Sequence, residues 1–342
     1  MPAPGEDMLG IRAASVARWF EANIDGASGP LAFELIAGGN SNLTYRVTDP
    51  AGAIYVLRRP PTGAVLATAH DMAREHRIIS GVARAGGVPV PRALGVCEDV
   101  DVNDAPFYVM SYVDGVVLDS AEKVDECFPA PAARELAGDD VVSILANLHA
   151  IDPDAVGLGD LGRKEDYLAR QIRRWRTQWE GSKTRELPVM DELADMLERA
   201  RPDQVGSSIV HGDFRLGNML TASDGHIAAV LDWELCTLGD PMADVGYVMN
   251  NWAAPGEEGP TNRGAAQAPT QAGGFLPRER FLEEYQALTG RDVSQVGYYR
   301  AFQYWRLAAI VEGVMGDEAD TDEFREQVES LAEAGHDLIR QR

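Results

Sequence analysis

The stretch His211-Gly212-Asp213-Phe214-Arg215-Leu216-Gly217-Asn218 decides how the rest of the 342-residue sequence is interpreted. It is followed by an apolar segment that ends in an acid and a tryptophan, Ala228-Ala229-Val230-Leu231-Asp232-Trp233. A positioned carboxylate can accept the proton of an attacking hydroxyl group, and carboxylate and amide oxygens are ligands that suit magnesium. These residue types in this order predict phosphoryl-transfer chemistry.

Three side chains in these two segments carry the predicted chemistry. Asp213 is the candidate catalytic base, Asn218 would bind magnesium through its carbonyl oxygen, and Asp232 would bind magnesium that bridges the phosphates. The competing interpretation is that Asp213 and Asn218 only shape a turn. The additional presence of Gly239-Asp240-Pro241-Met242-Ala243-Asp244 disfavours that interpretation. His211 is expected to hold the loop in place rather than to act as the base.

The composition indicates a globular protein with two lobes. The chain is longer than a single hydrophobic core usually supports, and 45% of its residues are hydrophobic. Its formal net charge of −23 should repel phosphate backbones and anionic lipid, so neither nucleic acid nor a membrane is an expected partner. Three cysteines without a CxxC pair, and no apparent leader or long apolar run, predict a cytoplasmic protein without disulfides or structural zinc. The oligomeric state stays open.

The first lobe, residues 1–112, is expected to be mainly sheet. Segments with period-two patterning predict strands at Phe33–Ile36, Leu43–Val47, Ala53–Arg59, Ala93–Cys97 and Phe107–Tyr112. Helical spacing predicts a short helix over Ala14–Asn23 and one main helix over Thr68–Ala85. The glycine-rich segment Gly38-Gly39-Asn40-Ser41-Asn42 predicts a turn between the first two strands.

The second lobe, residues 113–342, is expected to be mainly helical. Its composition predicts helices at Ala132–Ala150, Lys164–Glu180, Val189–Arg201, Pro277–Leu288 and Val296–Gly313. Short strands at Ser208–Val210 and Ala228–Leu231 flank the opening stretch and place its polar residues on a loop. The stretch from Asn251 to Gly274, rich in Gly, Ala, Pro and Gln, is interpreted as a mobile surface loop; whether it closes over a substrate stays open.

These motifs resemble those of the aminoglycoside phosphotransferase and choline kinase-like family, and in particular its subfamily related to the kinase-like domain fused to acyl-CoA dehydrogenases. The resemblance extends from about Phe33 to about Gly313. It rests on His211–Asn218, Leu231–Glu234 and Gly239–Asp244, with support from Leu145–His149 and Val56–Arg58. It implies an α+β, two-lobed protein-kinase-like fold, with a small antiparallel-sheet N-lobe containing one main helix and a larger, mainly helical C-lobe.

The resemblance also implies that the N-lobe binds ATP. The turn residues Gly38, Gly39, Asn40 and Ser41 would cover the phosphates, because backbone amide groups in such a turn can approach phosphate oxygens closely. Backbone groups of the hinge strand at Tyr108–Val113, including Met110 and Tyr112, would bind the edge of the adenine. A preference for ATP over GTP is not indicated.

On the third strand, Arg58 stands at the position where the family usually has Lys, and it would bind the α and β phosphates. Neighbouring residues of a strand face opposite sides, so only one of Arg58 and Arg59 should point toward the nucleotide. Glu75, in competition with Asp71, is expected to orient Arg58 through a bidentate pair. Whether an arginine supports full turnover at this position stays open, because its planar fork reaches differently from a lysine.

Other side chains are expected to be structural. His149 should pack or cap the end of its helix, and Asp240 and Asp244 would brace the metal loop or cap the following helix, as in the family. The aromatic residues should lie mainly in the core, although some could line an acceptor pocket: Trp252, Tyr298, Tyr299, Tyr304 and Trp305.

The resulting hypothesis is an ATP- and Mg²⁺-dependent O-phosphotransferase that transfers the γ-phosphate to a hydroxyl group of a small molecule. The acidic charge favours a cationic acceptor such as an aminoglycoside, whereas the resemblance favours a hydroxyacyl-CoA-like compound, whose phosphates could be bound by the cluster Arg170, Arg173, Arg174 and Arg176. The alternative is a nucleotide-binding pseudokinase or regulatory module without phosphotransfer, suggested by Arg58. A metal hydrolase that uses His211 and Asp213 would lack further convincing ligands.

Overall fold

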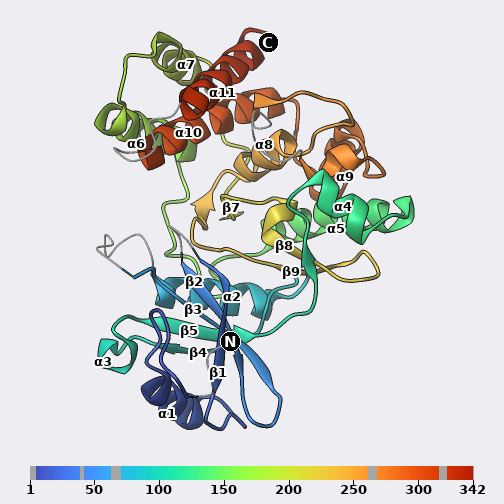
Figure 1. Cartoon of the computed structure of the whole chain (residues 1–342). Coiled ribbons are helices and arrows are strands. Elements are labelled where there is room, and N and C mark those ends of the chain that lie inside the picture. Colours follow the sequence, from blue (N-terminus) through green and yellow to red (C-terminus); the bar gives the residue numbers. More distant parts are fainter. Residues whose placement is uncertain (1–4, 39–41, 63–70, 261–267, 316–321, 342) are drawn as a thin grey trace. The chain divides into compact units, whose positions relative to one another are not determined.

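The computed structural model describes residues 5–38, 42–62, 71–260, 268–315 and 322–341. It divides into two compact units, shown by their elements in Figure 1. The first unit comprises Met1–Asp114 and Ala229–Glu234, and the second comprises Gly115–Ala228 and Leu235–Arg342. The segment that contains Asp232 therefore groups with the first unit, whereas the sequence placed it in the second lobe.

The first unit is built on a five-stranded antiparallel sheet with the strand order β1-β2-β3-β5-β4. The strands are β1 (Ala32–Ala37), β2 (Leu43–Thr48), β3 (Ile54–Arg59), β4 (Ala93–Cys97) and β5 (Phe107–Ser111). All five were predicted. The register pairs Arg58 of β3 with Thr44 of β2 and with Tyr108 of β5, so Arg58 lies on the central strand of the sheet.

In the described part of the first unit, three helices accompany this sheet: α1 (Ala13–Asn23), α2 (Met72–Ala85) and α3 (Val100–Asn103). Helix α1 buries Val16 and Phe20 in a core that also contains Phe33 and Phe107 of the sheet. Helix α2 begins after Asp71, whose side chain accepts a hydrogen bond from the backbone N–H of Arg74 at 2.9 Å. This capping bond makes Asp71 a helix cap, which leaves Glu75 as the helix residue that is available to pair with Arg58.

The second unit is mainly helical, with small strands around the opening stretch. Its helices are α4 (Ala121–Cys127), α5 (Pro131–Ala150), α6 (Tyr167–Ser182), α7 (Pro188–Arg199), α8 (Met242–Asn250), α9 (Arg278–Thr289), α10 (Val296–Met315) and α11 (Asp322–Arg340). The 3₁₀ segments are η1 (Leu216–Asn218) and η3 (Pro269–Ala272), and the strands are β6 (Val116–Val117), β7 (Ser208–Val210), β8 (Met219–Thr221), β9 (Ile227–Val230) and β10 (Thr237–Gly239). Helices α4 and α11 were not predicted.

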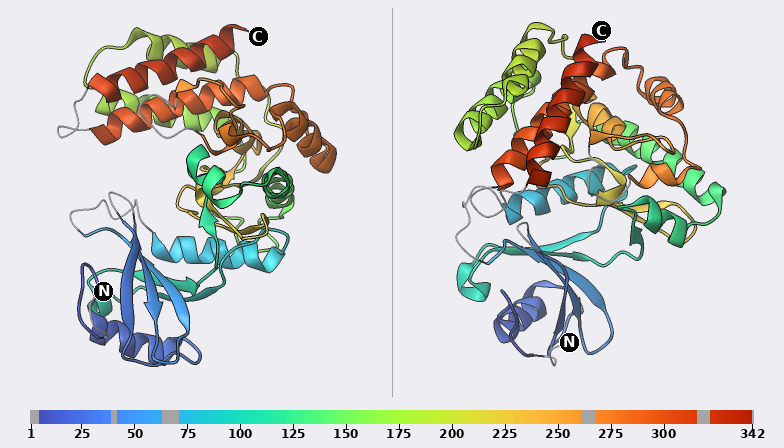
Figure 2. Two further views of the ribbon diagram at one scale, coloured as in Figure 1. Left: turned by 45° about the vertical axis from the view of Figure 1, so that its right-hand side comes forward. Right: turned by 45° about the horizontal axis from the view of Figure 1, so that its top comes forward.

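Helix α10 organises the core of the second unit, and Figure 2 shows it running beside α11. The predicted core aromatics are buried, with Tyr298, Tyr299 and Trp305 fully so. Helix α8 packs directly on α10, because a side-chain carbon at Gly246 would lie only 2.6 Å from the backbone of Tyr299. A glycine is therefore required at this helix crossing.

The described part of the stretch from Asn251 to Gly274 is exposed at Ala254–Gly256, as expected of a surface loop, but it differs from that expectation at Trp252 and Thr270. Trp252 and Thr270 are buried, the indole of Trp252 donates to the carbonyl of Leu276 at 2.8 Å, and the hydroxyl of Thr270 donates to the carbonyl of Ala253 at 2.8 Å. These tertiary contacts are invisible to a composition argument. Across the described ranges, no helix is long and apolar enough to span a membrane.

Candidate active site

The loop His211–Asn218 lies between β7 and β8 of the second unit and is anchored at its start by Asp244 of α8. The Asp244 carboxylate accepts hydrogen bonds from the backbone N–H groups of His211, at 2.7 Å, and Gly212, at 2.8 Å. Gly212 has a φ of +88°, and a side-chain carbon there would lie 2.9 Å from the carbonyl oxygen of Leu235. The predicted bracing role of Asp244 is thus observed, and the path of the loop is fixed before Asp213 is reached.

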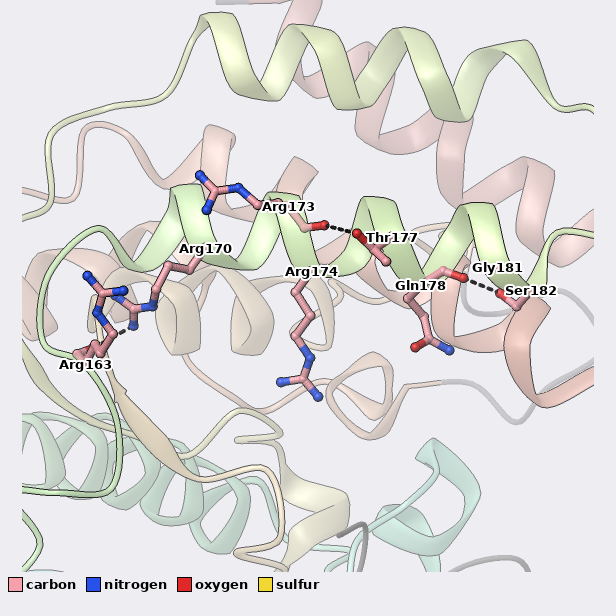
Figure 3. A pocket seen from close by; sticks show the side chains of 8 residues that line it. All are labelled: Arg163, Arg170, Arg173, Arg174, Thr177, Gln178, Gly181 and Ser182. Carbon is pink, nitrogen blue, oxygen red and sulfur yellow. Dashed lines mark hydrogen bonds between the residues drawn. The ribbon is translucent and has the colours of Figure 1, made fainter. Parts of the chain in front are cut away.

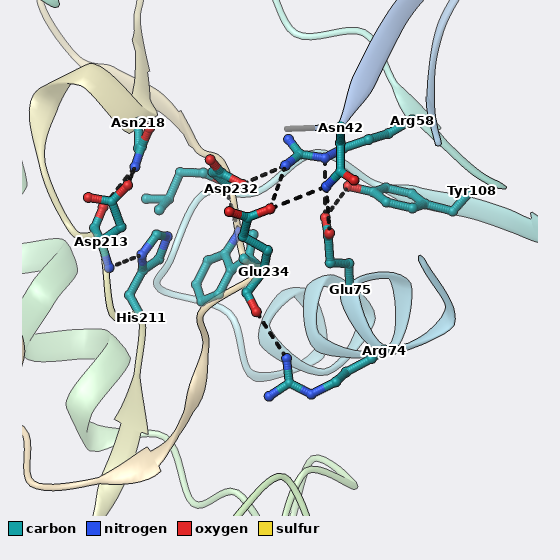
Figure 4. A network of polar contacts seen from close by, with 12 residues as sticks. Asn42, Arg58, Arg74, Glu75, Tyr108, His211, Asp213, Asn218, Asp232 and Glu234 are labelled. Carbon is teal, nitrogen blue, oxygen red and sulfur yellow. Dashed lines mark hydrogen bonds and ion pairs between the residues drawn. The ribbon is translucent and has the colours of Figure 1, made fainter. Parts of the chain in front are cut away.

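The Asp213 carboxylate is held by its neighbours in the same loop (Figure 4). Its Oδ2 accepts from Nδ2 of Asn218 at 2.6 Å, and its Oδ1 accepts from Nε of Arg215 at 3.2 Å. Its backbone N–H donates to Nδ1 of His211 at 3.2 Å, which is the scaffolding position expected for that histidine. The Asp213 side chain remains 21% exposed, so the carboxylate is both oriented and accessible within its unit.

Asn218 uses only its amide nitrogen in these contacts. Nδ2 donates to the carboxylate of Asp213 and also to its backbone carbonyl, at 2.9 Å. The side-chain oxygen Oδ1 has no hydrogen-bond partner within the described part of the chain. An oriented amide oxygen of this kind fits the preference of magnesium for oxygen ligands.

Behind the loop, Asp244 is tied to a buried histidine. Nε2 of His149 lies 3.3 Å from Oδ2 of Asp244, and Nδ1 of His149 lies 2.7 Å from the hydroxyl of Tyr285. Burial lowers the pKa of His149. Although burial would raise the pKa of Asp244, its hydrogen bonds to His149 and Gly212 hold that pKa below the usual range. His149 is therefore a packed structural residue, as predicted.

Asp240 forms the second predicted brace, at the start of α8. Its Oδ1 accepts from the backbone N–H of Met242 at 3.0 Å, and its Oδ2 accepts from the hydroxyl of Tyr299 at 2.7 Å. Asp240 is completely buried, and burial raises its pKa. The two aspartates of the motif thus tie α8 to α10 and to the loop that carries Asp213.

In the first unit, Arg58 lies among three carboxylates (Figure 4). Its Nη2 lies 2.5 Å from Oδ1 of Asp232 and 3.8 Å from Oε2 of Glu234, and its Nε lies 3.3 Å from Oε2 of Glu75. Burial alone would lower the pKa of Arg58, but Glu75, Tyr108 and Asp232 together raise it. Arg58 meets Glu75 through one nitrogen only, so the predicted bidentate pair was wrong: the fork of the guanidinium is shared between different acids.

Glu75 is the most deeply buried acid of this group, with 2% of its surface exposed. Its carboxylate accepts from the hydroxyl of Tyr108 at 3.1 Å and from Nδ2 of Asn42 at 3.1 Å. Burial raises the pKa of Glu75, whereas Arg58 lowers it. Asn42 also lies 3.4 Å from Oε2 of Glu234, which makes it a bridge between two carboxylates.

Sequence reasoning missed the roles of Asn42, Tyr108 and Glu234. Asn42 was assigned only to a turn, Tyr108 only to the backbone of a hinge strand, and Glu234 only to a motif. A tyrosine on a strand does suggest a hydroxyl that needs a partner, since buried tyrosines usually find one. The partner itself lies on another element and could not be identified from spacing.

Asp232 has a φ of +63°, which is uncommon for a residue other than glycine. Its side chain is 29% exposed, and it stands with Glu75 and Glu234 around a single guanidinium, so the group carries excess negative charge. Within the described residues, no cluster of three or more His, Cys, Asp or Glu side chains could hold a metal ion. Magnesium usually takes one or two protein carboxylates and completes its shell with water and phosphate oxygens, and the partly exposed Asp232 is one carboxylate of the kind it takes.

The remaining candidate nucleotide-binding residues belong to the first unit. Gly38 follows β1 and is exposed, whereas Gly39, Asn40 and Ser41 lie outside the described residues. Met110 is buried on β5, and Tyr112 directly follows that strand, with the guanidinium of Arg46 5.3 Å from the centre of its ring.

Arg59 is directed differently from Arg58. Its Nη1 donates to the carbonyl oxygen of Gly10 and, at 3.2 Å, to that of Asn103, neither of which contacts Arg58. The alternation predicted for these two arginines is confirmed.

Residues 32–276 match the model of the phosphotransferase enzyme family, and the chain belongs to this family. It has the protein-kinase-like fold and is a phosphotransferase with a hydroxyl group as acceptor. The chain is 33% identical to a Ralstonia eutropha protein assigned to the aminoglycoside phosphotransferases, whose structure superposes with a TM-score of 0.80 and covers 96% of this chain and 98% of that one.

Two further similarities relate the chain to other proteins. It is 34% identical, over 91% of its length, to acyl-CoA dehydrogenase family member 10 of Mus musculus, but spans only 30% of the length of that relative. Aminoglycoside phosphotransferase APH(4)-Ia, in a ternary complex with AMP-PNP and hygromycin B, is 17% identical with a TM-score of 0.63 and covers 94% of this chain and 99% of that one. At that identity the likeness concerns the fold alone.

Proposed function

We propose that the protein transfers the γ-phosphate of ATP to the hydroxyl group of a small molecule, with Asp213 as the catalytic base. The observation that carries the proposal is the Asp213 carboxylate, which is fixed by Asn218 and Arg215 and still accessible. The proton of the acceptor hydroxyl would move to this carboxylate. The use of ATP is supported by the fold shared with APH(4)-Ia, which forms a complex with AMP-PNP.

Asn218 and Asp232 are proposed as magnesium ligands, each through a side-chain oxygen. Magnesium, when bound, supplies charge neutralisation for the phosphates. Asn218 is suited to this role because its Nδ2 is already committed to Asp213, which fixes the orientation of Oδ1. Asp232 is suited because it belongs to a group with more carboxylates than cations.

Arg58 is proposed to bind the α and β phosphates and Glu75 to orient it. Gly38, Gly39, Asn40 and Ser41 would cover the phosphates, and the backbone near Met110 and Tyr112 would bind the adenine. Because Arg58 already sits among acids, its proposed task requires that phosphate oxygens replace the contact with Asp232, which magnesium coordination by Asp232 would favour.

The second candidate function is a nucleotide-binding pseudokinase, and one observation favours it. Arg58 and Asp232 form a 2.5 Å contact that occupies both a proposed phosphate ligand and a proposed metal ligand. A pseudokinase would bind Mg·ATP and release no ADP with any acceptor, whereas an enzyme without its acceptor usually hydrolyses ATP slowly.

A cavity of about 150 Å³ beside Asp213 bears on the acceptor. Its lining, as far as the chain is described, is largely apolar, with Asp213 as the one acid and Arg306 as the one cation: Gly212, Asp213, Leu235, Tyr247, Gln303, Arg306, Leu307 and Ile310. A polycationic aminoglycoside would find few acidic partners in such a lining, whereas an acyl chain bearing a hydroxyl group would bury apolar surface there. We therefore favour a hydroxyacyl-CoA-like acceptor, in keeping with the similarity to the mouse relative.

Cys97, Cys127 and Cys236 form no disulfide within the described ranges, which supports the further proposal of a cytoplasmic location.

The decisive test measures ADP release from Mg·ATP with hydroxyacyl-CoAs, aminoglycosides, choline-like alcohols and sugars. We expect release to depend on a hydroxyacyl-CoA, to cease when magnesium is chelated, and to fall by at least about 100-fold in kcat in Asp213→Asn, because the base is lost. Asp224→Asn, which makes the same change on an exposed turn of the same unit, serves as the control. Unchanged turnover in Asp213→Asn would disprove the assignment of the base, and silence across the whole panel with intact ATP binding would favour the pseudokinase.

A further inference from the structure

A cavity of about 650 Å³ lies along α6 in the second unit and is lined by four arginines (Figure 3). These are Arg163, Arg170, Arg173 and Arg174, and the remaining lining residues are neutral: Thr177, Gln178, Gly181 and Ser182. Among the described residues the lining thus contains no acid, in a chain that has 54 acidic residues against 31 Lys and Arg. This concentration of positive charge runs against the composition of the whole molecule.

The cavity follows one face of α6. Arg170, Arg174, Thr177, Gln178 and Gly181 recur at helical spacing on one face, which also carries the buried Tyr167 at the start of the helix. The other buried residues of α6 lie on another face: Leu168, Ile172 and Trp179. At the start of the helix, Nη2 of Arg170 donates to the carbonyl oxygen of Arg163 at 2.6 Å, which holds the two arginines together. Figure 3 shows Arg174 and Gln178 extending from the same side of the helix further along.

The four arginines make no ion pair with any acid in the described part of the chain. Arg176, two residues after Arg174 on the same helix, does pair with Asp195. In addition, Nη1 of Arg170 is buried without a hydrogen-bond partner. Burial and the neighbouring charge of Arg163 lower the pKa of Arg170, and Tyr167, Asp166 and Glu165 offset this only in part. Such like charges repel one another until an anion enters.

The same helix is connected to the loop that carries Asp213. The guanidinium of Arg174 lies 5.4 Å, and that of Arg306 5.5 Å, from the ring centre of Trp175 on α6. Arg306 in turn donates to the carbonyl oxygen of Gly212 at 3.1 Å. A ligand held by Arg174 is therefore linked, through two side chains, to the backbone next to the proposed base.

We propose that this cavity is an anion-binding site for the phosphate groups of a small organic ligand that carries at least two of them. Arginine forks match phosphate oxygens in a bidentate way, and the volume lies within the roughly 300–1,000 Å³ typical of ligand sites. Coenzyme A and a free polyphosphate share this chemistry. Identifying the ligand with the acceptor itself rests on the proposed function; anion binding does not.

The test is isothermal titration calorimetry on the full chain with coenzyme A, inorganic tripolyphosphate and pantetheine, which lacks phosphate. Coenzyme A should bind, pantetheine should not, and the affinity should fall with added NaCl. Arg170→Gln and Arg174→Gln should each weaken binding by about tenfold, as expected for the loss of one charged hydrogen-bonding group. Arg176→Gln is the matched control and should bind like the wild type, because that arginine is already paired and does not line the cavity.

Equal binding by all variants, or binding of pantetheine as tight as that of coenzyme A, would overturn the proposal, as would no binding of either phosphate ligand. Tripolyphosphate binding as tight as coenzyme A would identify the phosphates alone as the ligand. A second measurement guards against misfolding: removal of one repelling charge in Arg170→Gln should leave the melting temperature unchanged or raise it. Asp213→Asn should keep this binding, so a failure of the proposed function and a failure of the anion site give different results.

Discussion

Arg58 distributes its positive charge in a way that a lysine could not copy. Its Nε faces Glu75 while its Nη2 faces Asp232, so two nitrogens of one planar group serve acids on different elements. A lysine offers a single ammonium group on a flexible stem and would have to choose between them. The arginine at this position is therefore matched by its own carboxylate partners, among which Glu234 had no expected role.

Replacing Arg58 should reveal what this sharing contributes to stability. Arg58→Gln leaves Glu75 buried without its cation and should lower the free energy of unfolding by roughly 3 kcal/mol, because an unpaired buried charge is costly. Arg58→Lys keeps the charge and should lose clearly less. Urea denaturation followed by circular dichroism measures both. The interpretation fails if Arg58→Gln unfolds at the same urea concentration as the wild type.

His149 predicts a specific dependence of stability on pH. Its pKa is lowered in the folded protein, so the unfolded chain takes up a proton first as the pH falls below about 6.5. Stability is therefore present above that pH and is lost toward pH 5.5. The melting temperature of His149→Gln should fall less between pH 7.5 and 5.5 than that of the wild type.

The exposed His226 supplies a control of opposite sign. Its hydrogen bond to Asp140 raises its pKa, so it favours the folded state at acidic pH. His226→Gln should therefore make the acid-dependent fall in melting temperature steeper. Identical pH profiles for the wild type and His149→Gln would contradict the assignment to His149.

At the scale of elements, Gly212 joins β7 to the loop of Asp213 in a conformation that other residues rarely adopt. Gly212→Ala combines a φ of +88° with a 2.9 Å approach to the carbonyl of Leu235 and should destabilise the protein by roughly 1–3 kcal/mol. Gly256→Ala is the matched control, because its φ is +76° in open space. Thermal unfolding compares the two variants. A loss no larger than that of Gly256→Ala would show that the contact with Leu235 is unimportant.

The sequence was most informative where a structure depends on neighbouring residues. The five strands of the first unit follow from period-two patterning, and the contact between Asp213 and Asn218 follows from a motif whose two residues lie on one short loop. It was least informative where partners come from distant segments. Asn42 lies next to a strand of the sheet, whereas Glu234 comes from a much later part of the chain, so no local periodicity predicts their contact.

A second kind of failure concerns segments without regular structure. The residues around Trp252 and Thr270 have the composition of a surface loop, yet their side chains are buried against backbone carbonyls. Loop composition reflects backbone freedom, whereas burial is decided by what the loop meets after folding. The pair of Glu75 with Arg58 was predicted, whereas the hydrogen bond that Glu75 accepts from Tyr108 was not, because this contact depends on what the segments meet after folding.

At the scale of the whole molecule, charge is distributed very unevenly. The net charge of −23 suggested a cationic acceptor, yet two cavities of the second unit contain arginine, and one of them has no acid among its described lining residues. Net charge governs long-range attraction and solubility, while recognition depends on the few groups that line a site. The local groups are therefore the better guide to the ligand.

The grouping of Ala229–Glu234 with the first unit has a consequence for the order in which the protein is synthesised and folds. Residues 1–114 are synthesised before Asp232. The sheet of the nascent chain therefore contains Arg58 and Glu75 for a time but lacks the acid that lies 2.5 Å from Arg58. Gly115–Ala228 of the second unit are synthesised in that interval. The earliest part of the chain can thus complete its charged centre only after the later part has begun to emerge, which couples the two in time during biosynthesis.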